Sequence, residues 1–209
     1  CSFRSSLYQL SGVERRLGDL PAAEASARRV IAQNARSPLG YYALALALEE
    51  HRQYQAIVDA LAPAIADFRT RRSNNPSADL GLLLPHLGFA YQEVGDHEKA
   101  IATFEEARAL APTDAGVAAY LAQANLAAKK YAAAVEVTKK ARVEHPGDLR
   151  FARLEAQALR QSGKADDAVA VLREFATRQN TADAYVALAQ VYAEDRKSTR
   201  LNSSHVSES

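Results

Sequence analysis

Cysteine is almost absent from this sequence, since Cys1 is the only one among 209 residues. A single cysteine excludes a disulfide within the chain and a metal site built from several cysteines. Glycine (9) and proline (7) are also scarce and fall mostly between segments with helical periodicity, while helix-favouring Ala, Leu, Glu, Arg and Gln are frequent. With 48% apolar and 24% charged residues, the composition predicts a folded, all-α chain.

An excess of one charge is missing as well. The 26 basic and 25 acidic residues give a formal net charge of +1. The last fifteen residues hold three of the basic and two of the acidic side chains, so 23 of each sign remain without them. A chain of zero net charge has no electrostatic drive toward phosphate backbones, and we predict no nucleic-acid partner.

Long apolar runs are absent too. The longest uncharged apolar stretches, around Leu39–Leu48 and Leu80–Ala90, are far shorter than the about 20 residues that a helical membrane span needs. We therefore predict no membrane span. The compartment stays open between the cytoplasm and export from a bacterial cell. Because the chain does not begin with methionine, we expect its start to lie inside a longer gene product.

Motifs for catalysis and cofactor binding are missing. His97 and Glu98 begin like a zinc-protease helix, but Ile101 stands where the second histidine is needed. The sequence has no phosphate-binding glycine loop and no G-x-S-x-G motif. Adjacent carboxylates such as Glu105 and Glu106 point to different sides of a helix rather than toward one substrate. The sequence therefore predicts no enzyme activity, no cofactor and no metal site.

The main feature present is an internal repeat of 34 residues. Aligned on itself at this offset, the chain superimposes two sets of small residues: Ala100, Ala134 and Ala168, and Gly88, Ala122 and Ala156. Between Ile57 and Ala100 the step is 43 residues, which indicates nine inserted residues, and we place these near 73–77. The predicted units are 4–37, 38–80, 81–114, 115–148, 149–181 and an incomplete 182–194, which together form one solenoid domain over 1–194.

Each unit contains two segments with helical periodicity. In the third unit the first segment has its small and apolar residues on one helical face. Gly95 and Asp96 then interrupt the pattern, and Asp96 suits the N-cap of the second segment, which Pro112 ends.

This pattern resembles the tetratricopeptide repeat, and the third unit matches it at Leu84, Leu87, Gly88, Tyr91, Gly95, Ala100, Phe104, Ala107 and Pro112. Other units depart from the pattern, with Arg52 in place of the turn glycine, Asn125 and Thr138 at aromatic positions, Glu155 at a leucine position, and Pro63 inside a second helix, where a kink is expected. The resemblance covers residues 4–194. It implies a right-handed superhelical solenoid of antiparallel helix pairs, with about five and a half repeats.

The resemblance also implies a function, namely a protein–protein interaction scaffold. In such a solenoid the first helix of each unit lines a concave groove that holds a peptide or a segment of a partner protein. The candidate groove residues are Tyr42, Leu46, Phe89, Gln123, Arg150, Arg153, Gln157 and Arg160. Tyr42, Leu46 and Phe89 are large apolar groups that the repeat does not require, which suits an anchor site. The alternative is that Tyr42 and Phe89 pack against neighbouring first helices.

Three arginines suggest the partner's chemistry. Arg150, Arg153 and Arg160 fall on one helical face, and guanidinium groups bind carboxylates through paired hydrogen bonds. We therefore expect a partner segment with an apolar anchor and acidic residues beside it. The alternative is a solvated face on which these arginines pair with Glu155 and Asp148. In members of this family that clamp a chaperone's terminal carboxylate, three successive units carry a set of Lys, Asn and Arg residues. No three successive units show that set here, so we do not expect this protein to bind a chaperone tail.

Two other interpretations remain open. The chain would also fit the helical regulatory or substrate-recruiting arm of a larger enzyme, including an exported one, or a self-associating solenoid that uses its incomplete last unit; the oligomeric state stays open. Residues 195–209 resemble a translated sequencing adapter, and their serine-rich composition is typical of disorder. We treat this tail as non-native and exclude it from the functional argument.

Overall fold

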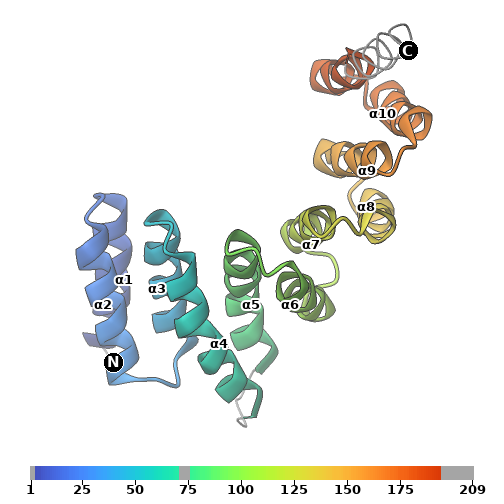
Figure 1. The fold of residues 1–209 in the computed structure, drawn as a ribbon. Coiled ribbons are helices and arrows are strands. Elements are labelled where there is room, and N and C mark those ends of the chain that lie inside the picture. The colour runs from blue at the N-terminus through green and yellow to red at the C-terminus, as the bar shows by residue number, and fades with distance from the viewer. Residues whose placement is uncertain (1–2, 71–75, 194–209) are drawn as a thin grey trace, which may run out of the picture. The chain divides into compact units, whose positions relative to one another are not determined.

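The computed structural model describes residues 3–70 and 76–193, and all regular secondary structure in these residues is helical (Figure 1). Ten of the helices in these residues are labelled: α1 (Phe3–Arg16), α2 (Leu20–Gln33), α3 (Pro38–Glu50), α4 (Tyr54–Thr70), α5 (Pro76–Glu93), α6 (His97–Leu110), α7 (Ala115–Ala127), α8 (Tyr131–Glu144), α9 (Leu149–Gln161) and α10 (Ala165–Gln179). A further helix follows them at 182–193. The sequence thus predicted the all-α fold and its helix pairs correctly. None of the helices in these residues combines the length and the hydrophobicity of a membrane span.

Tight turns join the two helices of each pair, and each turn has one residue with a positive φ. These residues are Gly18, Arg52, Gly95, Lys129 and Gly163, with φ between 56° and 85°. They occupy the same position of the repeat. Side chains disfavour this left-handed conformation, so Arg52 and Lys129 adopt it against their intrinsic preference because the turn requires it.

The predicted boundaries of the third unit's second helix are confirmed. Asp96 is the N-cap of α6, and its carboxylate accepts a hydrogen bond from the Lys99 backbone N–H at 3.2 Å. The helix ends at Leu110, two residues before Pro112. The cap satisfies a backbone donor that the first turn of a helix leaves without a partner.

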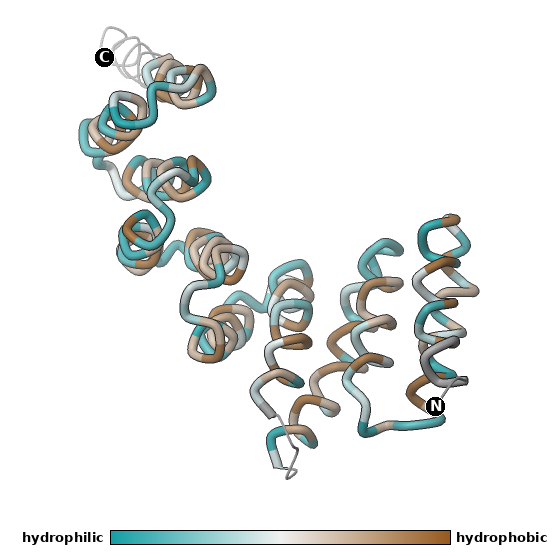
Figure 2. The backbone as a smooth tube through the Cα atoms, turned by 180° about the vertical axis from the view of Figure 1, so that it is seen from behind, coloured by the Kyte–Doolittle hydropathy of each residue, from teal (hydrophilic) through white to brown (hydrophobic). Residues whose placement is uncertain are grey.

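The chain forms two compact units, Cys1–Val117 and Ala118–Ser209, and each is described by itself. In the first unit, α1 contacts α3 and α3 contacts α5, so the first helices of successive pairs form one layer. Helix α2 packs between α1 and α3, and α4 packs between α3 and α5. In Figure 2 apolar and polar segments alternate along these helices, as expected for helices that bury one stripe. The largest fully buried side chains of the unit include Leu44, Leu48, Ile57, Leu61, Ile65, Leu83, Leu84 and Phe104.

Gly88 shows why the repeat requires small residues at one position. A Cβ atom at Gly88 of α5 would lie 2.7 Å from the ring of Phe104 in α6. The two helices cross so closely that any side chain would displace this buried ring. The equivalent residues Ala122 and Ala156 are also buried, with exposed fractions of 0% and 1%.

The nine inserted residues lengthen two helices. Helix α4 has 17 residues and α5 has 18, compared with 14 in α2 and 13 in α3. Residues 73–75 of the predicted insertion lie outside the described residues, while 76 and 77 belong to the first turn of α5. Helix α5 therefore begins before the repeat boundary predicted at 81. Helix α4 runs through Pro63, which is exposed.

The second unit continues the pattern of helix pairs. Helix α9 contacts both α8 and α10. Phe151, Ala156, Leu172 and Phe175 contribute to its apolar core. The predicted adapter-like tail at 195–209 lies outside the described residues.

Candidate functional site

A hollow of about 540 Å³ lies between α1 and α3 in the first unit. We call it the tyrosine hollow. Ten residues line it: Tyr8, Gln9, Ser11, Gly12, Val13, Arg15 and Arg16 of α1, and Tyr42, Ala43 and Leu46 of α3. Two of the predicted groove residues, Tyr42 and Leu46, thus line one hollow between successive first helices.

Small residues create the space in this hollow. A Cβ atom at Gly12 would have no neighbouring atom within 4 Å, and Ala43 is 5% exposed. Ser11 is 2% exposed, and its hydroxyl donates to the Ala23 carbonyl of α2 at 2.8 Å, which fixes α1 against the second helix of its pair. At the rim, the Arg15 guanidinium forms an ion pair with Glu50.

The aromatic candidates also pack within the first unit. Tyr42 places its ring against that of His86 in α5, with ring centroids 5.2 Å apart and planes at 67°. His86 Nδ1 lies 2.6 Å from the Glu49 carboxylate of α3. Phe89 packs against Tyr54, with ring centroids 5.7 Å apart, and it does not line the tyrosine hollow. Tyr42 therefore both packs on a neighbouring first helix and forms a wall of the hollow.

A second hollow, of about 350 Å³, lies in the second unit between α9, α10 and the helix at 182–193. We call it the arginine hollow. The residues that line it are Arg153, Ala156, Gln157, Arg160, Gln161, Leu172, Ala187, Gln190 and Val191. It brings together three of the predicted groove residues, Arg153, Gln157 and Arg160, all exposed. Gln123 of α7 is exposed and does not line this hollow.

Arg150 does not line the arginine hollow, and its guanidinium is bound to Asp148. Arg150 Nη2 donates to Asp148 Oδ2 at 2.6 Å, and Arg150 Nε donates to Asp148 Oδ1 at 3.0 Å. Asp148 is also the N-cap of α9 and accepts from the Arg150 backbone N–H at 3.0 Å. The hydrogen bond from the Arg150 side chain lowers the pKa of Asp148, and the same bond raises the pKa of Arg150.

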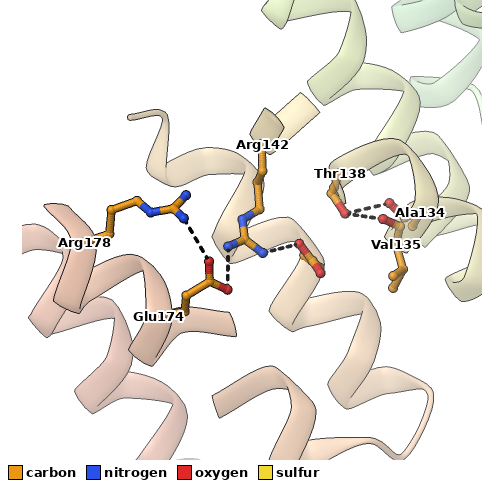
Figure 3. Close-up of polar contacts among 7 residues, drawn as sticks. Ala134, Val135, Thr138, Arg142, Glu174 and Arg178 are labelled. Atoms are coloured by element: carbon orange, nitrogen blue, oxygen red, sulfur yellow. Dashed lines mark hydrogen bonds and ion pairs between the residues drawn. The ribbon is translucent and has the colours of Figure 1, made fainter. Parts of the chain in front are cut away.

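Glu155 corrects one part of the sequence interpretation, since it does not pair with the surface arginines. It is 1% exposed, and its Oε2 accepts from Arg142 Nη1 of α8 at 2.9 Å. Arg142 also donates to Glu174 of α10 at 3.3 Å, and Arg178 lies 3.7 Å from the same carboxylate (Figure 3). Burial lowers the pKa of Arg142, but its hydrogen bonds to Glu155 and Glu174 outweigh burial and raise it overall.

The sequence contained one signal for this buried network. The repeat expects leucine at position 155, which places the residue in the core, and a buried carboxylate needs a charged partner. Arg142 stands 13 residues earlier, on another helix, so spacing alone did not identify it. In residues 3–70 and 76–193, no group of three or more His, Cys, Asp or Glu side chains is arranged to hold a metal ion.

Comparison with known proteins agrees with this architecture. Residues 91–158 match the sequence profile described as Tetratricopeptide repeat. No curated protein sequence matches the chain. The three solved structures described next share 17% sequence identity or less with this chain, so they bear on the fold alone.

Three solved structures illustrate the similarity. A tetratricopeptide repeat protein from Parabacteroides merdae has a TM-score of 0.72 at 17% identity, covering 94% of this chain and 75% of that one. A MamA protein has a TM-score of 0.70 at 16% identity, covering 85% and 92%. A MamA fragment from Desulfovibrio magneticus has a TM-score of 0.71 at 16% identity, covering 86% and 97%. Residues 91–158 thus match the tetratricopeptide repeat, and the chain has the fold of the solved tetratricopeptide repeat solenoids that it resembles.

Proposed function

We propose that this chain is a protein-binding scaffold whose first helices hold a peptide or a segment of a partner protein. The single observation that supports this most strongly is the arginine hollow, where Arg153 and Arg160 are both exposed beside a space of about 350 Å³. Guanidinium groups in such a place suit carboxylates of a partner segment.

The apolar part of the partner would bind in the first unit. Tyr42 and Leu46 are half-buried and line the tyrosine hollow. Interfaces gain most of their binding energy from a few such apolar and aromatic contacts. Gln157 adds a neutral donor and acceptor between the two arginines of α9.

The test is selection of peptides from a random phage-displayed library on the full chain. We expect the enriched peptides to combine at least one large apolar residue with a surplus of Asp and Glu. Enriched peptides with a basic surplus, or no enrichment above the unselected library, would contradict the proposal.

A further inference from the structure

The tyrosine hollow offers space between α1 and α3 for a side chain of a partner. Gly12, where a Cβ would meet no atom within 4 Å, and the buried Ala43 are two of the residues that line it. Tyr8 and Tyr42 stand on opposite helices of the hollow, on α1 and α3. Both tyrosines are half-buried and pack against the apolar core of the first unit. The space beside Gly12 is therefore not filled by the chain itself.

One wall of this pocket is held in place from behind. The Tyr42 ring contacts His86 at 5.2 Å between centroids, and Glu49 binds His86 at 2.6 Å. These contacts join α3 to α5, so Tyr42 does not need to be ordered when a ligand enters. A wall that is already ordered reduces the entropy lost on binding.

The charges around the hollow select the ligand further. Arg15 and Arg16 are the charged residues that line it, and both are basic. Glu50 neutralises Arg15, while Arg16 is exposed. An acidic ligand group beside the pocket would therefore gain an attraction at Arg16, and a cationic group would be repelled.

We propose that the tyrosine hollow binds an aromatic side chain of the partner peptide, with a carboxylate of the same peptide beside Arg16. Aromatic rings gain additional attraction from other aromatic rings, in offset or edge-on contact, beyond their buried area. The inference rests on the proposed function, because it names the residue that the partner would insert into the scaffold. Gly12 is then the residue that determines which side chains fit.

The experiment uses the full chain and 3-phenylpropionate as the probe, followed by NMR. We expect the probe to shift the amide signals of Gly12, Val13 and Ala43, with a dissociation constant on the order of a few millimolar for a ligand of this size. The aliphatic match, 3-cyclohexylpropionate, should bind about two- to tenfold more weakly. The cationic match, 3-phenylpropylamine, should bind more weakly than the carboxylate.

A matched pair of variants tests the position of the pocket. Gly12→Leu places a large side chain in the lining of the hollow, whereas Gly81→Leu places the same side chain in α5 at another site with no atom within 4 Å. Both replace a glycine inside a helix by a better helix former, so both should remain folded. We expect Gly12→Leu to abolish the shifts at Val13 and Ala43 and Gly81→Leu to retain them, and Gly12→Ala serves if the larger side chain prevents folding.

Three results would overturn the inference: no shift at these amides in the unmodified chain, cyclohexyl binding as tight as phenyl binding, or full probe binding by Gly12→Leu. The library selection and the binding of its peptides to the arginine hollow do not use this probe. If the peptides bind there while the probe fails, only the present inference is lost and the proposed function stands.

Discussion

At the residue scale, single side chains carry both the strain and the pH dependence of the fold. The turn residues Arg52 and Lys129 have φ of 56° and 59° where other turns have glycine. The N-cap residues Asp96 and Asp148 are bound to cationic neighbours, which lower the pKa of each carboxyl. Each feature leads to a separate prediction.

Replacing Lys129 by glycine should stabilise the protein. The left-handed conformation costs a residue with a side chain about 1 kcal/mol or more, while the extra freedom of glycine in the unfolded chain offsets part of this gain. We expect a net increase of about 0.5 kcal/mol in the free energy of unfolding, measured by urea denaturation. Gly95→Ala, at the equivalent turn with φ of 85°, is the control and should destabilise. A Lys129→Gly variant no more stable than the parent would show that this turn is not strained.

Asp148 should make the stability of the protein fall at acid pH. Its folded pKa is lowered, first by the side-chain hydrogen bond from Arg150, so its contribution is complete above the ordinary Asp pKa of about 3.9. The contribution is lost as the pH falls through the lowered pKa. In Asp148→Asn, which retains a good capping side chain, unfolding free energies measured between pH 5 and about 3 should depend less on pH. An unchanged pH dependence would mean that the Asp148–Arg150 pair contributes nothing to it.

At the element scale, the repeat pattern predicted the helix pairs well but did not predict the lengths of all the helices. The 34-residue step identified the helix pairs, the turn at Gly95 and the cap at Asp96. It did not predict that inserted residues would lengthen α4 and α5, because an offset counts residues without specifying their conformation.

The candidate site was predictable to a similar degree. Helical periodicity placed Arg153, Gln157 and Arg160 on one exposed face, and they do line one hollow. It also placed Arg150 there, although Asp148 binds the guanidinium of that residue. The position of a long side chain depends on its hydrogen-bond partner, which a one-dimensional pattern does not contain.

The ion pair between Arg142 and Glu155 connects α8 to α9, and its removal should show how much these helices depend on it. Glu155→Leu restores the residue typical of the repeat but deprives Arg142, which is 16% exposed, of its buried partner. We expect a loss of about 1 to 3 kcal/mol in the free energy of unfolding, because the half-buried Arg142 keeps only its more exposed partner, Glu174.

A second substitution should reverse most of this loss. In Arg142→Leu combined with Glu155→Leu, two apolar side chains replace the pair, and stability should return to within about 1 kcal/mol of the parent. Glu174→Leu removes the more exposed partner of Arg142 and should cost less than about 1 kcal/mol. Urea denaturation of Arg142→Leu, Glu155→Leu and the double variant measures the coupling. If the losses of the two single variants add up in the double variant, the two residues are not coupled.

At the scale of the whole molecule, the chain has almost no net charge, with 26 basic and 25 acidic residues. Binding of an acidic segment would therefore depend on where arginines gather rather than on a field from the entire protein. Such contacts are partly exposed to solvent, so affinity should fall as salt is added. Stacking between helix pairs determines the core of a solenoid, so recognition of a partner would depend on its surface residues.

The most direct test of the scaffold is the affinity of a library-selected acidic peptide, measured by titration calorimetry. Arg153→Glu with Arg160→Glu should weaken binding at least about tenfold, because each reversal replaces a charge-assisted hydrogen bond by repulsion. The control is Arg29→Glu with Lys140→Glu, which changes the net charge equally at exposed positions of α2 and α8 and should leave the affinity unchanged. Equal affinity of the first variant and the parent, or equal weakening by both variants, would contradict binding at the arginine hollow.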